Sequence, residues 1–161
     1  MGAATLRRIT VNVSEHFTLE ELTFSQAALR SGIDNTPPPD ALNNLRLLST
    51  GLLEPVRTLL WVPLHVDSGY RSPAINHLVG GAVNSAHLDG RAADIIPVGL
   101  SLKDAFNALY NSALPFDQLI LECNAWLHLS VPEVGKEARR QALLASGGPG
   151  NWHYVTAGAL D

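Results

Sequence analysis

Two side chains that can ligate a metal lie seven positions apart in the segment Ser85–Asp94, whose sequence is SAHLDGRAAD. Gly90 stands between them and permits a sharp bend, so that His87 can fold back beside Asp94. The two alanines that precede Asp94 would leave space around its carboxylate. Because imidazole and carboxylate groups are common zinc ligands, this segment predicts two positions of a metal site.

A second histidine lies in the alternating segment Trp126–Ser130, WLHLS. Strand alternation places Trp126, His128 and Ser130 on one face, and the leucines between them on the other. The leucine face would belong to the core. His128 is therefore expected on a semi-polar face, where it can bind a ligand.

Together, His87, Asp94 and His128 would supply three protein ligands and leave a fourth position for water, which is the pattern of a catalytic zinc site. Each motif alone has an ordinary alternative. A lone histidine in a strand is usually a packed or surface side chain, and the Asp-Gly-Arg sequence at 89–91 is compatible with a simple turn. The combination favours the metal site, although the residues alone leave both interpretations open.

The elements that must position these residues follow from capping residues and apolar spacing. Helices are predicted over 19–29, 40–60 with Asp40 as the cap and a bend near Gly51 or Pro55, 72–79 and 102–113. Strands are predicted over 64–69, 92–98, 118–122 and 126–131, and the segment GGPGNW at 147–152 is predicted to be a loop. Because helices and strands do not alternate as regular βαβ units, the pattern favours an α+β fold.

Length and composition limit the class of protein. The chain has 161 residues, 46% of them hydrophobic and 16% charged, which indicates one globular domain over residues 1–161. The net charge of 11 − 15 = −4, without a Lys/Arg cluster, argues against nucleic-acid binding. The single cysteine, Cys123, excludes an intramolecular disulfide and a CxxC zinc site. The longest apolar run, near Leu59–Leu64, is too short to cross a membrane. We also expect the protein to be a monomer.

The N-terminal segment is not expected to be a targeting signal. The residues that follow Arg7 and Arg8, ITVNVSEHF, are too polar for the core of a signal peptide. Leu6 stands where a myristoylation pattern requires Ser or Thr. We therefore expect a protein made in the cytoplasm without a signal peptide, which would act elsewhere only after release.

Three segments match a known family in order and spacing: SGYRSPAIN at 68–76, VGGAVNSAHLDGRAADI at 79–95 and WLHLS at 126–130. They resemble the M15 zinc peptidases, and more narrowly the D-Ala-D-Ala carboxypeptidase-like branch that is common in phage genomes. The segment FTLEELTFSQAALRSGIDN at 17–35 also resembles the N-terminal part of that branch. The resemblance covers residues 17–130.

Membership of this family implies that His87, Asp94 and His128 bind Zn²⁺ and that the substrate is a peptidoglycan stem peptide. It also implies the M15/Hedgehog-like peptidase fold. In that fold, helices pack against a small antiparallel sheet, and the zinc site lies in a cleft on the sheet.

The arginine of SGYRS, Arg71, is a candidate catalytic and substrate-binding residue. The resemblance implies that it lies near the metal and contacts the scissile carbonyl or a substrate carboxylate, which suits a guanidinium with several N–H donors. The alternative is a surface salt bridge. Ser85 is a candidate substrate-binding residue whose hydroxyl would bond Asp94 or the turn backbone, or it is simply a turn residue.

The general base is harder to assign. Many M15 enzymes have Asp or Glu three residues before the last zinc histidine, where this chain has Ala125. Glu122 is the best replacement if the strands around it pair as a hairpin, with Glu122 opposite Trp126 and Ile120 opposite His128. A register shifted by one residue would turn Glu122 away from the metal, and the alternative is a solvent-facing hairpin residue.

The predicted reaction is hydrolysis of an amide bond in a peptidoglycan stem peptide or cross-link, by a DD-carboxypeptidase or an endopeptidase such as a phage endolysin. The zinc would acidify its bound water, Glu122 would carry the proton to the leaving amine, and Arg71 would help to stabilise the oxyanion. It would act on the bacterial cell wall after release or as part of a phage particle. The alternative is a non-catalytic zinc-bearing module that binds the wall or belongs to a phage particle, and Ala125 keeps this alternative open.

Cys123 and an aromatic segment near the C-terminus lie outside the predicted metal site. Cys123 lies in a predicted turn without a positioned base, so we expect a structural cysteine rather than a nucleophile. The sequence Trp152–His153–Tyr154 follows a glycine-rich segment. It is expected either to cover a groove or to form a C-terminal packing strand.

Overall fold

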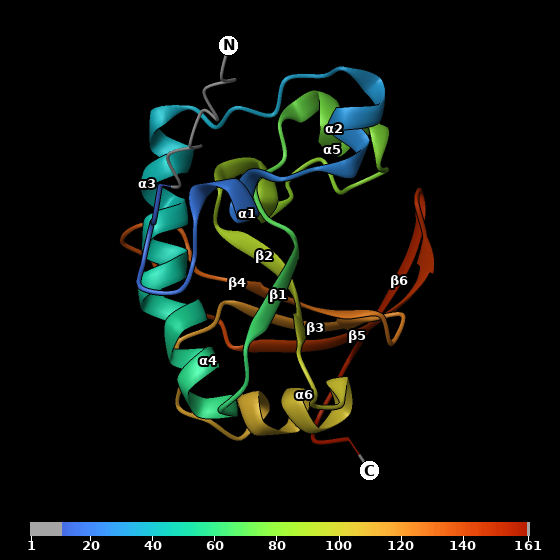
Figure 1. Ribbon diagram of the computed structural model, residues 1–161. Helices are drawn as coiled ribbons and strands as arrows, with labels where there is room; N and C mark the ends of the chain where they lie inside the picture. The colour runs from blue at the N-terminus through green and yellow to red at the C-terminus, as the bar shows by residue number, and fades with distance from the viewer. Residues whose placement is uncertain (1–10, 161) are drawn as a thin grey trace.

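The structure, a computed structural model, describes residues 11–160. Most of the segment behind the expectation of no signal peptide lies outside these described residues. Six strands form one mixed sheet in the order β1-β2-β4-β3-β5-β6 (Figure 1). The strands are β1 Leu64–Ser68, β2 Ala92–Pro97, β3 Gln118–Glu122, β4 Trp126–Ser130, β5 Gln141–Gly148 and β6 Asn151–Thr156.

Helices pack against this sheet, which confirms the α+β fold class. They are α1 Leu19–Thr23, α2 Gln26–Ser31, α3 Pro39–Leu48, the π-helical turn η1 Ser49–Leu53, α4 Glu54–Leu60, α5 Pro73–Leu78, the 3₁₀ turn η2 Ala86–Asp89 and α6 Leu102–Tyr110. Figure 1 shows α3 and α4 along one side of the sheet, while α1, α2 and α5 gather at one end. Among the described residues, no helix has the length and apolar character needed to cross a membrane.

Two helical predictions need correction, one for an internal break and one for the residue at its start. The segment predicted as one helix over 19–29 forms two, because Ser25 accepts a hydrogen bond from the backbone N–H of Ala28 and caps α2. The predicted cap Asp40 lies inside the first turn of α3, which starts at Pro39 without a side-chain cap. The bend predicted near Gly51 or Pro55 is the π-helical turn, because the proline ring has no N–H for the carbonyl of Gly51 and would collide with it.

The sheet has one buried face and one face that carries the polar motifs. Leu127 and Leu129 of β4 are fully buried in the main core, as the strand alternation predicted. Helix α6 contacts β2, β3 and β4, and its fully buried Phe106 and Leu109 belong to the same core. Burying a side chain of this size contributes about 1.5–3 kcal/mol. Because side chains alternate along a strand, Asp94 and His128 lie on the face opposite to this core.

The C-terminal part of the sheet departs from the predicted antiparallel arrangement. Strands β3 and β5 pair in parallel, and all other neighbours pair antiparallel. The predicted loop at 147–152 is also wrong in extent, because its outer residues pair in β5 and β6 and only Pro149–Gly150 form the turn. Glycines can take part in this pairing because the strand ladder uses only backbone groups. Gly147 adopts φ +105, where a Cβ would lie 2.1 Å from the Asn151 carbonyl oxygen, so this position requires glycine.

An ion pair holds the start of β5 beside β3. Asp117, immediately before β3, accepts hydrogen bonds from the backbone N–H of Arg139 at 3.1 Å and from its guanidinium at 2.6–3.1 Å. The backbone N–H of Gln141 also donates to the Asp117 carbonyl oxygen at 2.9 Å. These contacts place the chain that returns from β4 in register for parallel pairing.

This ion pair predicts a pH-dependent contribution to stability. Hydrogen bonds from Arg139 lower the pKa of Asp117 in the folded protein, so the stabilisation is complete above about pH 4, the ordinary range of an unfolded aspartate, and is lost as the pH falls through the lowered pKa. We expect Asp117→Asn to reduce the free energy of unfolding at pH 7 by about 1 kcal/mol, measured by denaturant titration.

The exposed Asp67→Asn is the matched control, since no hydrogen bond to the Asp67 side chain is found within residues 11–160. It should leave stability unchanged. A difference between Asp117→Asn and the native protein that persists undiminished at pH 2 would contradict the ion-pair origin.

Candidate metal centre

A short 3₁₀ turn positions His87. The Ser85 hydroxyl accepts from the backbone N–H of His87 at 3.4 Å, and Gly90 ends the turn at φ +71. A Cβ on Gly90 would lie 2.4 Å from the backbone oxygen of Ala41, so glycine also permits close packing against α3. The ring Nδ1 lies 2.6 Å from the carbonyl oxygen of Gly69. Since a carbonyl only accepts, Nδ1 carries the proton and Nε2 presents its lone pair to the cleft.

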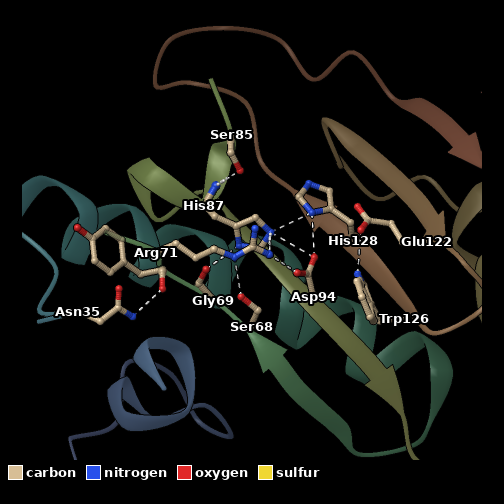
Figure 2. A network of polar contacts seen from close by, with 11 residues as sticks. Asn35, Ser68, Gly69, Arg71, Ser85, His87, Asp94, Glu122, Trp126 and His128 are labelled. Atoms are coloured by element: carbon tan, nitrogen blue, oxygen red, sulfur yellow. Dashed lines mark hydrogen bonds and ion pairs between the residues drawn. The ribbon is translucent and has the colours of Figure 1, made fainter. Parts of the chain in front are cut away.

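Strand register positions the other two candidates. Asp94 of β2 lies directly opposite His128 of β4 in the antiparallel pair. Directly opposed residues point to the same face of a sheet, here the face away from the leucine core. His87, Asp94 and His128 are all buried and meet at this point (Figure 2).

The three side chains present a triangle of ligand atoms. His87 Nε2 lies 3.2 Å from Asp94 Oδ1 and 3.1 Å from His128 Nδ1, and the third side, from His128 Nδ1 to Asp94 Oδ1, is 3.0 Å. Ligands about 2.0–2.1 Å from a tetrahedral zinc ion lie about 3.3 Å from one another, so the triangle closely matches one face of such a tetrahedron. Because the proton of the His87 ring is on Nδ1, only His128 Nδ1 can carry a proton that lies between these three atoms. The three ligand atoms therefore fit a bound cation.

Burial and charge favour the forms of these residues that bind metal. Burial lowers the pKa of His87, and the nearby Arg71 acts in the same direction although Asp94 opposes both. For Asp94, burial works against ionisation, but the contacts with His87 and His128 hold the pKa of the carboxyl well below its usual range. The centre therefore combines a neutral imidazole with a charged carboxylate, as metal binding requires.

Arg71 is part of this centre rather than a surface salt bridge. Its Nη2 lies 2.6 Å from Asp94 Oδ2 and 3.2 Å from His87 Nε2, while its Nε donates to Ser68 Oγ at 2.9 Å (Figure 2). Ser68 lies opposite Asp94 in the β1–β2 pair, next to an irregularity in the register. The contact with Ser68 thus holds the Arg71 guanidinium in place beside the Asp94 carboxylate.

The loop that carries Arg71 depends on two residues that the sequence did not single out. Asn35 donates through Nδ2 to the carbonyl oxygens of Thr23 and Tyr70 at 2.9 and 3.0 Å and accepts from the Ser72 backbone N–H at 2.7 Å. Gly69 passes so close to α1 that a Cβ would lie 2.2 Å from the Leu22 oxygen. The only sequence signal for Gly69 was its place in SGYRS, and Asn35 had none of its own.

Glu122 lies on the same face as the metal candidates. The predicted hairpin register is confirmed, with Glu122 opposite Trp126 and Ile120 opposite His128. Trp126 Nε1 donates to Glu122 Oε2 at 3.1 Å, and Figure 2 shows the carboxylate turned toward the His128 ring. Burial raises the pKa of Glu122, and the negative charge of Asp94 adds to the effect.

One cleft of about 1090 Å³ is lined by the three metal candidates, Arg71 and Glu122. Ser85 also lines it, but its hydroxyl bonds the turn backbone and not Asp94. Outside the centre, His65, His77 and His153 are exposed, and His16 pairs with Glu54 at 2.8 Å. Cys123 is exposed in the β3–β4 turn.

The three hydrogen bonds of Asn35 predict that it stabilises the loop beside the centre. We expect Asn35→Ala to lower the free energy of unfolding by about 2 kcal/mol and to weaken zinc binding, because the carbonyls of Thr23 and Tyr70 lose their donor and the loop carrying Arg71 is released. Chemical denaturation and competition with a zinc chelator measure the two effects. Asn43→Ala, an exposed position on α3, is the control and should change neither. An equal loss in both variants would contradict the assignment.

Comparison with known proteins identifies the family. The family model for peptidase M15 matches residues 15–130, which include α1, the loop carrying Arg71 and the three metal candidates. A search against curated proteins found no match. M15 peptidases are zinc-dependent, which agrees with a donor triangle of two imidazoles and a carboxylate. The chain therefore belongs to the peptidase M15 family.

Proposed function

We propose that this protein is a zinc-dependent peptidase that hydrolyses amide bonds in peptidoglycan stem peptides or their cross-links. The observation that carries the proposal is the convergence of His87, Asp94 and His128 in a cleft that also contains Glu122 and Arg71. Membership of the M15 family supports peptide hydrolysis, and the resemblance to the D-Ala-D-Ala carboxypeptidase-like branch supports peptidoglycan as the substrate.

The metal would be held by His87 Nε2, Asp94 Oδ1 and His128 Nδ1. Bound there, Zn²⁺ would supply Lewis acidity toward the scissile carbonyl and toward water. The protein keeps the ligands oriented through the bond from His87 Nδ1 to the Gly69 carbonyl oxygen, a second contact of the kind that fixes metal-binding histidines.

Glu122 is proposed as the general base and acid. Trp126 holds Oε2, which leaves Oε1 to accept a proton from the attacking water. Glu122 then donates that proton to the nitrogen of the breaking amide bond, so that the products are a carboxylate and an amine. This position takes over the task for which many M15 enzymes use the residue three before the last histidine, here Ala125.

Arg71 is proposed to bind the substrate oxygen. Its Nε and Nη2 are engaged by Ser68, Asp94 and His87, whereas its Nη1 has no hydrogen-bond partner among residues 11–160. The side chain is 17% exposed and lines the cleft. Its free N–H groups can therefore donate to the developing oxyanion or to a substrate carboxylate.

The extent of the cleft favours an internal bond or a cross-link as the scissile amide. Along the strands, lining residues continue past the metal candidates in both directions, to Gln118 and Arg139 on one side and to Gly147 and Trp152 on the other. Residues two apart on a strand are about 7 Å apart, so each side has room for at least one substrate residue. A carboxypeptidase also places one residue on each side of the scissile bond, but its cleft would end beyond the terminal carboxylate, whereas this cleft continues on both sides.

Substitutions should separate metal binding from proton transfer. His87→Ala and His128→Ala should lose stoichiometric zinc and activity, because only two ligands remain. Glu122→Gln should keep the zinc and lose at least about 100-fold in kcat, the usual contribution of a general base. Zinc is measured by metal analysis, and activity by mass spectrometry of digested peptidoglycan. Full activity in either histidine variant would contradict the site.

The same digest tests the substrate, with His128→Ala as the control. Split stems or opened cross-links would support the proposed endopeptidase, whereas loss of terminal D-Ala alone would identify a carboxypeptidase. Zinc-loaded protein that produces neither change would reject catalysis in favour of a wall-binding module.

The contact between Trp126 and Glu122 predicts a shift in the pH profile. The acid limb of kcat/KM reports ionisation of the base, and the Trp126 donor lowers the pKa of Glu122 against the effect of burial. Trp126→Phe removes this donor, so the acid limb should move to higher pH while zinc content stays constant. An acid limb at the same pH in both proteins would argue against Glu122 as the base.

A further inference from the structure

The β5–β6 hairpin lies outside the residues matched by the family model, yet it forms part of the cleft. The match ends at residue 130, whereas the hairpin begins at Gln141. Trp152 and Tyr154 of β6 line the same cavity as Glu122 and His128. The hairpin therefore adds a wall that the family motifs do not describe.

Strand register aligns Tyr154 with the proposed base. Glu122 lies opposite Ala145 in β5, and Ala145 lies opposite Tyr154 in β6. Side chains of directly opposed residues share a face, so all three point to the metal side of the sheet. Neighbouring strands are about 4.8 Å apart, which places the backbones of Glu122 and Tyr154 about 10 Å apart with only a methyl group between them. The phenol of Tyr154 can extend over Ala145 into the space beside Glu122.

Packing holds the hairpin in this position. Trp152 packs against the small cluster of Ile120, Leu143 and Ala145 on the metal side of the sheet. At the tip, Pro149 lies so close to Gly80 that a Cβ on Gly80 would be 2.6 Å from the proline Cβ. Figure 1 shows β6 rising from the sheet edge toward the loop that follows α5. These contacts hold the tip end of β6, and the pairing of Thr156 with Leu143 holds its other end, so the position of Tyr154 beside the cleft is fixed.

The Tyr154 hydroxyl is a free hydrogen-bond donor. Its side chain is half exposed, and no partner for the hydroxyl is found among residues 11–160. Burial raises the pKa of Tyr154, and the negative charges of Glu122 and Asp94 add to the effect, so the phenol keeps its proton. Trp126, the neighbouring donor, is already bonded to Glu122.

We propose that Tyr154 is a further substrate-binding residue, whose hydroxyl donates a hydrogen bond to a carbonyl or carboxylate oxygen of the peptide held beside Glu122. This inference rests on the proposed function. A neutral donor suits this place, because an acceptor oxygen of the substrate would otherwise meet the carboxylates of Glu122 and Asp94 without a partner on the hairpin side.

The test compares Tyr154→Phe with Tyr110→Phe, which removes the same hydroxyl from α6, outside the cleft. The substrate is a disaccharide-peptide dimer that ends in D-Ala-D-Ala, because it contains terminal, internal and cross-link amide bonds. We expect Tyr154→Phe to lower kcat/KM by about five- to tenfold, the effect of one hydrogen bond, with unchanged zinc content. Tyr110→Phe should match the native protein.

A binding measurement gives a second readout. In the Glu122→Gln background, calorimetric titration with the same dimer should show a Kd about five- to tenfold higher when Tyr154 is also replaced by Phe. The dimer without its sugars should show the same ratio. A ratio that appears only with the sugars would overturn a contact to the peptide.

The outcomes separate the two proposals. Native protein that cleaves the dimer, with equal kcat/KM and Kd for Tyr154→Phe, would overturn the inference and leave the proposed function intact. Zinc-loaded native protein that neither cleaves nor binds the dimer would overturn the proposed function and the inference with it.

Discussion

The centre depends on holding two imidazole nitrogens and a carboxylate oxygen within 3.2 Å of one another inside the protein. Such an arrangement is unfavourable without a cation or a proton between the atoms, so rigid elements must impose it. The direct pairing of Asp94 with His128 fixes two corners through the backbone of β2 and β4. The third corner, His87, is fixed by the hydrogen bond from its ring to the Gly69 carbonyl oxygen.

That carbonyl links the centre to the rest of the N-terminal half. Gly69 approaches the backbone of Leu22 more closely than any side chain would allow, and Asn35 joins the same loop to α1 and α5. The same loop directs Arg71 at Asp94. Changes in α1 or in the segment around Asn35 should therefore reach the metal candidates through the loop and not through the sheet.

The division of the sheet into two faces explains how a small protein can hold both a core and a cleft. Alternation along β4 sends Leu127 and Leu129 to the helices and His128 to the opposite side. The β5–β6 hairpin extends this second face beyond the residues matched by the family, and its Trp152 covers part of the floor. The metal candidates thus lie within the cleft and not at its edge.

The sequence by itself determined the α+β class and most strands, because these follow from local alternation and caps. It left two hairpin registers open, and the structure decided for the one that places Glu122 opposite Trp126. The tertiary structure decided what depends on contacts distant in the chain. The parallel pairing of β5 rests on Asp117 and Arg139, 22 residues apart. Asn35 reaches Tyr70 across 35 residues, and Tyr154 joins the cleft only through two successive strand pairings. Local patterns carry no information about such partners, since the chain between them can adopt many paths.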